Sequence, residues 1–502
     1  MKKRSDDNKE LFYRWKEKTE KAEAGAQRET DPDRLKLHLM PPVGWLNDPN
    51  GLCQFHGIYH VFFQYSPESP SGDGLKAWGH YTSKDFLCWN QEETLFFPDE
   101  AFDKDGVYSG SACISEGKMN LYYTGNVKEE GIHDYICSGR GANTVLIQSG
   151  DGREFSEKQL LMTSADYPDT YTCHIRDPKV WVRDDQFYMV QGGRKYGADR
   201  EDRTLDQGAI LLFQGKDEKN FRFVKEITTE TPFGYMWECP DYFELGETKI
   251  LSFSPQGLNE ETYRFQNVYQ SGYLLLEKAP ETWETYEKVD GSAFQEWDMG
   301  FDFYAPQTFE TEDGRRILIG WAGIPDAAYD NEPTVQNGWQ HALTLPRELS
   351  AKNGKIYQNP IRELQQLRDT ECRIDTGETC LLENEVFELT VCGNDTQENV
   401  SVQFTDGKES VTLEYRQDEG VLSLALSDAC GRGRTVRRMK LGQFRNVQIF
   451  ADTSMIEIYI NDGEAVMTSR FYMDHTQRAV KVCGTAENTL WYLKGLKVDF
   501  RK

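Results

Sequence analysis

Short apolar runs alternate with turn residues from Leu35 to about Glu348. The runs are rich in Tyr, Phe, Val and Trp, and Gly, Asp, Asn or Pro bounds each of them; examples are YHVFFQY, KMNLYYTG, KILSFSP and RRILIGWAG. Runs of this length and composition are typical of β-strands. In KVWVRDDQFYMVQGG the polar pair Asp184-Asp185 separates two apolar halves, which predicts a hairpin. The helical period is nearly absent, so the pattern predicts an all-β unit.

Residues able to carry chemistry recur near positions 48, 109, 177, 238 and 304. The interval of roughly 60 residues is about the length that four strands and their turns require. This spacing favours radial repetition in a β-propeller. A large sandwich or a β-helix would satisfy the same pattern, and the periodicity alone leaves these alternatives open.

The residues before this unit have a helical pattern. We expect residues 1–34 to form an N-terminal helical segment, with one surface helix from about Asn8 to Arg28. Thr30-Asp31-Pro32-Asp33 then breaks the helix. Three apolar residues at helical spacing are expected to dock it: Leu11, Phe12 and Trp15.

A second all-β unit is predicted at the C-terminal end. Residues 349–371 read as a linker with a turn at Asn353-Gly354, and residues 372–502 alternate regularly, as in EVFELTV, VTLEY and MIEIYI. Asn461-Asp462-Gly463 is a strong hairpin signal. We therefore expect a β-sandwich there, with the larger β unit spanning 35–348.

Composition narrows the possible partners and the compartment. The 502 residues include 83 acidic and 57 basic side chains, a net charge of −26 that argues against nucleic acid as a partner. No stretch approaches the roughly 18 apolar residues of a membrane span, and no apolar run follows the basic start of the chain. Eleven cysteines without a C-x-x-C pair favour reduced thiols and a cytoplasmic location. The oligomeric state stays open, a homodimer being possible.

Three carboxylates lie on proline-bounded segments: Asp48 in WLNDPNG, Asp177 in RDP and Glu238 in WECP. A retaining glycosidase needs one carboxylate as nucleophile and one carboxylic acid, about 5–5.5 Å apart, to protonate the leaving oxygen. Asp48 lies among asparagines, which suits an ionised nucleophile, whereas Glu238 lies between a tryptophan and a cysteine, which should raise its pKa. Asp177 follows an arginine and should stay charged.

The motifs extend beyond these carboxylates. WLNDPNG, FFQY, WGH, YSGS, RDPKVW, WECPDYF, DFYAPQTF and LPREL occur in this order. In these motifs the chain resembles the β-fructofuranosidase family of invertases, levanases and sucrose-6-phosphate hydrolases, over roughly residues 37–365. The resemblance implies a five-bladed β-propeller followed by a β-sandwich, with a pocket on the propeller axis and no metal or other cofactor.

The resemblance also implies residue roles. Asp48 matches the nucleophile that forms a fructosyl-enzyme intermediate, Glu238 the acid/base and Asp177 the transition-state stabiliser. The positions that match substrate-binding residues are Asn47, Gln64, Trp78, Tyr108, Ser109, Arg176, Tyr304 and Trp321.

The activity expected is that of a retaining exo-β-fructofuranosidase, which releases terminal β-D-fructosyl units from sucrose, short fructo-oligosaccharides or sucrose 6-phosphate. A fructosyltransferase, a glycosidase for another furanoside and a non-catalytic sugar-binding protein are the alternatives. Asp73 replaces a tryptophan found in many relatives, which argues against an anionic ligand near it. The polar stretch 193–207 contains four basic residues that could face a phosphate or only water: Arg194, Lys195, Arg200 and Arg203.

Overall fold

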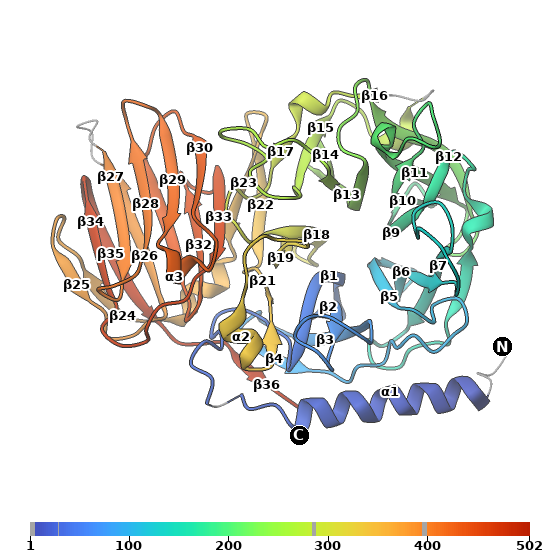
Figure 1. The fold of residues 1–502 in the computed structure, drawn as a ribbon, viewed down its shortest axis with the longest axis horizontal. Helices are drawn as coiled ribbons and strands as arrows, with labels where there is room; N and C mark the ends of the chain where they lie inside the picture. The colour runs from blue at the N-terminus through green and yellow to red at the C-terminus, as the bar shows by residue number, and fades with distance from the viewer. Residues whose placement is uncertain (1–5, 29, 284–287, 394–398, 502) are drawn as a thin grey trace.

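The chain folds into two β units that lie side by side (Figure 1). The structure is a computed structural model that describes residues 6–28, 30–283, 288–393 and 399–501. Most of its regular structure is β-strand, as the sequence predicts. No helix in the described ranges is long and apolar enough to cross a bilayer.

Within the described part of the first unit, five sheets stand in a ring (Figure 1). The first contains β1 (Gly44–Phe55), β2 (Ile58–Ser66), β3 (Ala77–Ser83) and β4 (Cys88–Gln91), flanked by β20 (Trp339–Gln340) and β36 (Lys497–Asp499). The second contains β5 (Val107–Ser115), β6 (Lys118–Lys128), β7 (Arg140–Ser149) and β8 (Gln159–Met162). The third contains β9 (Tyr171–Arg183), β10 (Gln186–Lys195), β11 (Gln207–Gly215), β12 (Phe221–Thr229) and β16 (Lys288–Val289).

The last two sheets complete the ring. The fourth contains β13 (Met236–Leu245), β14 (Thr248–Gln256), β15 (Gly272–Leu276) and β17 (Gln295–Glu296). The fifth contains β18 (Tyr304–Glu310), β19 (Arg316–Ala322), β21 (Ala342–Leu343), β22 (Arg347–Lys352) and β23 (Lys355–Pro360). The first strands of the five sheets contact one another in the cyclic order β1, β5, β9, β13, β18 and back to β1. These strands therefore enclose the centre of the ring.

The turn residues Asp184 and Asp185 explain the register of the β9–β10 hairpin. Asp184 and Asp185 both have positive φ, 49° and 57°, and they connect Arg183 directly to Gln186 in the β9–β10 hairpin. Two successive positive φ angles suit the right-handed twist of the strands, and Asp tolerates them better than most residues do. The hairpin predicted from the polar pair is confirmed.

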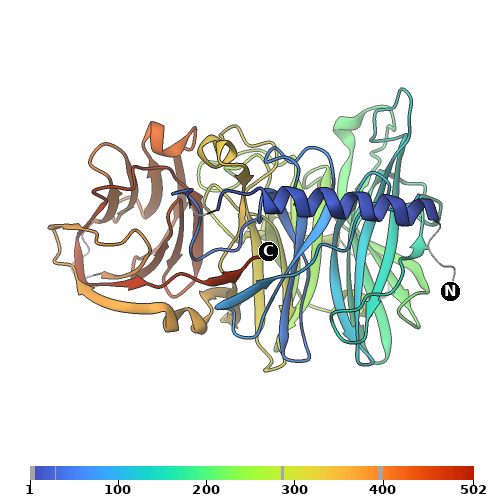
Figure 2. The same cartoon turned by 90° about the horizontal axis from the view of Figure 1, so that it is seen from below.

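The N-terminal helix α1 (Asp6–Ala24) lies along the outside of the ring (Figures 1 and 2). Phe12 and Trp15 pack on a small apolar cluster that includes Leu75 and Phe97. Two of the three residues predicted to dock the helix therefore do so, and the helix ends four residues earlier than expected. Its C-terminal turn carries Glu23, whose buried carboxylate accepts a 3.0 Å hydrogen bond from the Tyr65 hydroxyl.

The segment expected to be a linker is largely part of the ring. Residues 347–360 form the β22–β23 hairpin, which pairs with β19. Leu349 and Ile356 are buried there with apolar residues of the fourth and fifth sheets. The interpretation of this segment as a connector was wrong because its short strands contain few apolar residues. Only the 3₁₀ turn Arg362–Leu367 separates β23 from the next strand.

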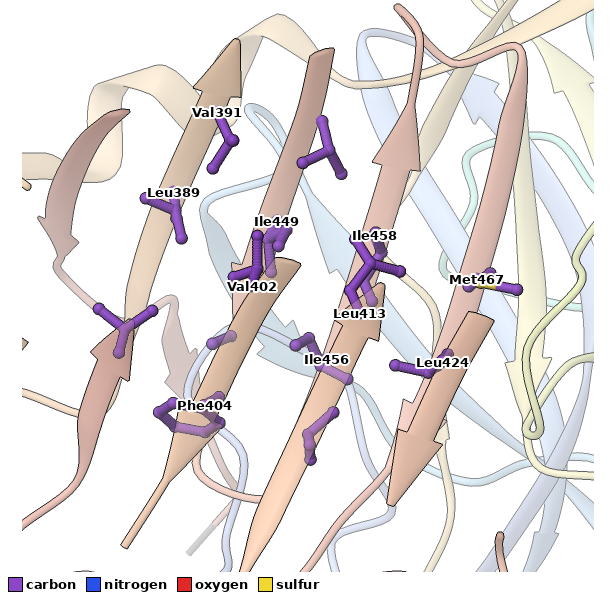
Figure 3. Close-up of a cluster of buried hydrophobic side chains, with 14 of the residues drawn as sticks. Leu389, Val391, Val402, Phe404, Leu413, Leu424, Ile449, Ile456, Ile458 and Met467 are labelled. Carbon is purple, nitrogen blue, oxygen red and sulfur yellow. The ribbon is translucent and has the colours of Figure 1, made fainter. Parts of the chain in front are cut away.

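In the described part of the C-terminal unit, two six-stranded sheets pack face to face. One contains β24 (Arg368–Arg373), β35 (Thr485–Leu493), β26 (Phe387–Gly393), β31 (Asn446–Ala451), β32 (Met455–Ile460) and β33 (Ala465–Arg470). The other contains β25 (Thr379–Leu381), β34 (Ala479–Cys483), β27 (Val400–Thr405), β28 (Ser410–Arg416), β29 (Val421–Leu426) and β30 (Val436–Lys440). Side chains such as Leu389, Val402, Leu413 and Ile458 fill the space between them (Figure 3).

The described residues also include two short helices, α2 (Glu332–Gln336) near the junction and α3 (Asp428–Gly431) in the sandwich. The two units meet through buried charges. Arg347 of the fifth sheet donates to Asp298 at 3.0 Å and to Glu457 of the sandwich at 2.9 Å. Buried ion pairs of this kind fix orientation, since removing one partner leaves an uncompensated charge. The sandwich is thus held rigidly against the ring.

Candidate active site

Each inner strand has an irregular register at the position of a predicted site residue. Asp48 in β1, Ser109 in β5 and Asp177 in β9 lie within the shifted stretch of their strands, whereas in β13 and β18 the shift begins directly after Glu238 and Tyr304. A β-bulge of this kind turns a side chain away from the regular alternation. Five bulges in five neighbouring strands therefore bring residues from five distant segments to the centre of one ring.

Backbone strain accompanies the bulges. Asp177 has φ of 64°, Cys239 has 46° and Ala305 has 48°, all in the left-handed region that non-glycine residues rarely adopt. Such angles cost of order 1–3 kcal/mol each and persist only where the surrounding structure enforces them. Their clustering at one end of three inner strands marks this location as a functional site.

The Asp48 carboxylate is held at both of its oxygens. Asn47 donates through Nδ2 to Oδ1 at 3.1 Å, and the Ser109 hydroxyl donates to Oδ2 at 2.6 Å. The indole N–H of Trp45 donates to Asn47 Oδ1 at 2.8 Å, which fixes the orientation of the amide. Burial raises the pKa of Asp48, whereas the hydrogen bonds from Ser109 and Asn47 lower it. The carboxylate is therefore immobile and poorly hydrated.

Cys239 links Asp48 to Asp177. Its thiol lies 3.6 Å from Oδ2 of each carboxylate, and its backbone N–H donates to Asp177 Oδ2 at 2.9 Å. The backbone N–H of Asp177 is bound in turn to Thr124 Oγ1 at 2.9 Å. The Cys239 sulfur therefore contacts two of the three predicted carboxylates, those of Asp48 and Asp177.

The sequence led us to expect that Asp177 stays charged because it follows an arginine, but burial outweighs the effect of that arginine on its pKa. Burial raises the pKa of Asp177 to about 7, with Arg176 lowering it and Glu238 raising it. The guanidinium of Arg176 is turned toward Glu238, to which Nε donates at 3.0 Å. Asp177 is therefore buried without a direct ion pair to this arginine.

The Glu238 carboxylate lies in a polar setting. Besides Arg176 at Oε1, Gln256 Nε2 and the Tyr304 hydroxyl each donate to Oε2 at 2.7 Å. The sequence interpretation placed this side chain in a less polar environment, and that was wrong. Its neighbour Trp237 is fully buried on the opposite side of β13 and stacks on Phe253 at 4.2 Å, so it does not border the carboxylate.

The predicted substrate-binding residues fall into two groups. Asn47, Ser109, Arg176 and Tyr304 contact the carboxylates directly. Tyr108 is half-buried beside Ser109. Trp321 packs edge-on against Trp45 at 5.9 Å and Tyr304 at 6.3 Å, and its indole N–H has no hydrogen-bond partner in the described ranges.

Gln64 and Trp78 support the site from behind. Gln64 donates to the Val107 carbonyl at 2.9 Å, and Trp78 donates to the Tyr108 carbonyl at 3.1 Å. Trp78 is only 1% exposed, in a core cluster with Phe62. The prediction that Trp78 binds substrate was wrong, because its ring faces the core and its one donor is already used.

Sequence reasoning missed several residues that complete the site. Cys239 adjoins Glu238 in the sequence and could have been considered from its position alone. Thr124, Gln256 and His341 gave no local signal, since they come from other segments of the chain. The buried ring of His341 packs 4.3 Å from Trp45 and 5.0 Å from Trp321, centroid to centroid.

Replacing Asp177 with Asn is expected to stabilise the protein at alkaline pH. The folded-state pKa of about 7 lies above the unfolded value of roughly 3.9, so the native state loses stability as pH rises between these values. Asn does not ionise and should recover roughly 1–3 kcal/mol at pH 8. The melting temperature of Asp177→Asn should exceed that of the wild type at pH 8 and approach it at pH 5. An equal difference at both pH values would contradict the raised pKa.

Comparison with known proteins assigns the family. Residues 38–360 match the glycosyl hydrolases family 32 N-terminal domain, and residues 355–498 match the family 32 C-terminal domain. A sucrose-6-phosphate hydrolase of Bacillus subtilis is 38% identical over 478 residues, which cover 93% of this chain and 94% of that protein. A raffinose invertase of Escherichia coli is 34% identical, with coverage of 91% and 94%.

Solved structures agree with the sequence matches. A GH32 β-fructofuranosidase of Bombyx mori has a TM-score of 0.81 at 29% identity and covers 97% of this chain and 99% of its own. A sucrose-6-phosphate hydrolase of Lactobacillus gasseri has a TM-score of 0.82 at 26% identity, with 96% of each chain covered. The fold and the ordered motifs define a glycoside hydrolase. The chain belongs to glycosyl hydrolase family 32, and the resemblance seen in the motifs is confirmed.

Proposed function

We propose that this protein is a retaining exo-β-fructofuranosidase that hydrolyses terminal, non-reducing β-D-fructosyl units of sucrose and short fructo-oligosaccharides. The main support is the convergence of Asp48, Asp177 and Glu238 from three inner strands, with one thiol between the first two and Arg176 on the third. The names of the relatives, sucrose-6-phosphate hydrolases and β-fructofuranosidases, point to the same substrates.

The geometry suits a double displacement. Asp48, held by Asn47 and Ser109, attacks the anomeric C2 of fructose while Glu238 gives its proton to the leaving oxygen, and the C2–O bond breaks. Water then attacks C2 of the fructosyl-enzyme, Glu238 takes its proton, and the bond to Asp48 breaks to free fructose. Asp177 steadies positive charge that develops on the ring in both steps.

The remaining polar groups fit recognition of one furanose ring. We propose that Asn47, Tyr108, Ser109, Arg176, Tyr304 and Trp321 contact the fructosyl unit. Trp321 supplies the strongest argument, because its unpaired buried N–H would cost free energy unless a ligand or water accepts from it. A ring hydroxyl is a suitable acceptor, and the aromatic wall suits the apolar face of a sugar.

We also propose the finer architecture. The five sheets, with first strands in cyclic contact, are read as the five blades of a β-propeller that spans about residues 38–360. The sandwich then begins near residue 368. Eleven free cysteines suit a reducing compartment such as the cytoplasm.

Incubation with sucrose tests the proposal. Equal release of glucose and fructose is expected, and fructose should appear first as the β-anomer by NMR because two displacements restore the configuration. Oligosaccharides in place of free fructose would indicate a fructosyltransferase. Sucrose binding without turnover would indicate a non-catalytic binder, and cleavage of an arabinoside alone would indicate another furanosidase.

A further inference from the structure

A group of arginines lies near Arg176, the residue that pairs with the proposed acid/base Glu238. Arg140 at the start of β7 and Arg194 near the end of β10 lie close to His174, and Arg203 in the following loop shares the Asp206 carboxylate with Arg194. All three arginines are half-buried. We call these four residues the cationic rim, which contrasts with a net charge of −26 for the chain.

His174 is the neutral centre of the rim. Its Nε2 lies 2.9 Å from the Tyr135 carbonyl and so carries the proton, and its Nδ1 accepts from Arg176 Nη1 at 2.7 Å. Arg140 Nε donates to the same Tyr135 carbonyl at 3.2 Å. Burial and the charges of Arg176, Arg140 and Arg194 lower the pKa of His174 to about 2. Through Arg176 the rim connects directly to Glu238.

Two loops hold the rim in place without a ligand. The backbone N–H of Cys173 donates to the Ile136 carbonyl at 2.8 Å, and Arg203 Nη1 lies 3.0 Å from the Cys137 sulfur. The Asp134 carboxylate accepts three backbone N–H groups of its own loop, those of Ile136, Cys137 and Ser138. The guanidinium groups are therefore largely preformed rather than free to move apart.

The nearby carboxylates do not neutralise the rim. Asp206 is shared by Arg194 at 2.7 Å and Arg203 at 3.7 Å, whereas Arg140 has no carboxylate within ion-pair distance in the described ranges. Arg203 Nη2 is buried without a hydrogen-bond partner in the same part of the chain.

Two other acids of the β10–β11 loop cap their own turns, and a third, Glu201, is exposed. Asp199 accepts from the backbone of Glu201, and Asp202 accepts from that of Thr204. These two carboxylates are therefore not paired with the rim, which keeps an unused N–H donor on Arg203 and is connected to the acid/base through Arg176.

We propose that Arg140, Arg194 and Arg203 form a phosphate subsite for a leaving-group sugar that carries a phosphate monoester, as in sucrose 6-phosphate. Planar guanidinium groups bind phosphate oxygens with paired hydrogen bonds, which suits them to this task better than lysines. The acid/base marks the leaving-group side of the bond, and Arg176 places the rim on that side. Asp73, which argued against an anion, belongs to the β2–β3 loop of a different sheet. The inference rests on the proposed function.

The test compares kcat/KM for sucrose 6-phosphate and for sucrose in the wild type and in Arg140→Gln and Arg194→Gln. The wild type should prefer the phosphorylated substrate by about tenfold or more, and each variant should lower this preference by about tenfold, because a charge-assisted contact to phosphate is lost. Arg222→Gln is the matched control: it removes an exposed arginine from β12 of the same sheet and should leave the ratio unchanged.

Inhibition by products separates the possible ligands. Glucose 6-phosphate should inhibit the wild type more strongly than inorganic phosphate or glucose, and Arg140→Gln should weaken its inhibition selectively. Equal inhibition by inorganic phosphate and glucose 6-phosphate would indicate a general anion site and overturn the proposal. The proposal would also be overturned if the wild type showed no preference for sucrose 6-phosphate, or if Arg140→Gln left the ratio of the two kcat/KM values unchanged. The result for Arg140→Gln is decisive if Arg194→Gln does not fold. Absence of turnover with both sugars would instead refute the proposed function.

Discussion

Replacement of Asp48 with Asn is expected to abolish sucrose hydrolysis, lowering kcat by about 10⁴-fold or more. Asn keeps the size of the side chain and can still accept from the Ser109 hydroxyl. It lacks the negative charge needed to attack C2 and to form the ester intermediate. The chemical step should therefore fail while substrate binding persists, so that KM changes little in comparison with kcat. Fructose release under substrate saturation measures the effect.

The folded state should tolerate this change. Burial already raises the pKa of Asp48, so the native state gains when the charge is removed, and the melting temperature should not fall. Asp151→Asn is the matched control, since that exposed side chain caps its own turn at a distance from the site, and it should keep full activity. Near wild-type turnover in Asp48→Asn would remove the assignment of the nucleophile.

Local sequence signals predicted the strands and the identity of the site better than its geometry. Each of these signals is encoded by a few neighbouring residues: the turn at Asp184-Asp185, the alternation of apolar and polar residues in the sandwich strands, and the proline near each carboxylate. The bulges that contain Asp48 and Asp177, and the one that follows Glu238, depend on pairing with a neighbouring strand, and no short motif predicts a register shift.

The wrong predictions for the surroundings of Glu238 and for Trp78 also arise because the contacts of a strand residue depend on other segments of the chain. Trp237 adjoins Glu238 in sequence, yet alternation along β13 sends its ring to the opposite face. The true partners of Glu238 are Gln256 and Tyr304, respectively 18 and 66 residues further along the chain. Likewise, Trp78 belongs to a motif that predicted a substrate-binding residue, yet its ring packs in the hydrophobic core. In a β-strand, adjacent residues point to opposite faces of the sheet. The residues next to a side chain in the sequence therefore do not define its environment.

Glu238→Gln is the second variant with a large expected effect, a loss of about 10³-fold or more in kcat with sucrose. Gln can accept from Arg176 through its amide oxygen and can donate through its NH2 group to the Tyr304 hydroxyl oxygen, so the site should keep its shape. It has no proton to give to the glucosyl oxygen, which must then leave as a poorly stabilised anion. Asp48 remains competent, and the loss should depend on how much the leaving group needs protonation.

That dependence distinguishes an acid/base from a residue that only positions others. A β-fructofuranoside with a nitrophenyl leaving group needs little protonation, so Glu238→Gln should form the fructosyl-enzyme from it far faster than from sucrose, with a rapid burst of nitrophenol. Azide needs no general base and should accelerate the slow second step, giving a β-fructosyl azide. A Gln256→Ala variant, which removes only a partner of Glu238, should slow both substrates to a similar extent. Equal losses with both substrates in Glu238→Gln, and no response to azide, would instead assign Glu238 a positioning role.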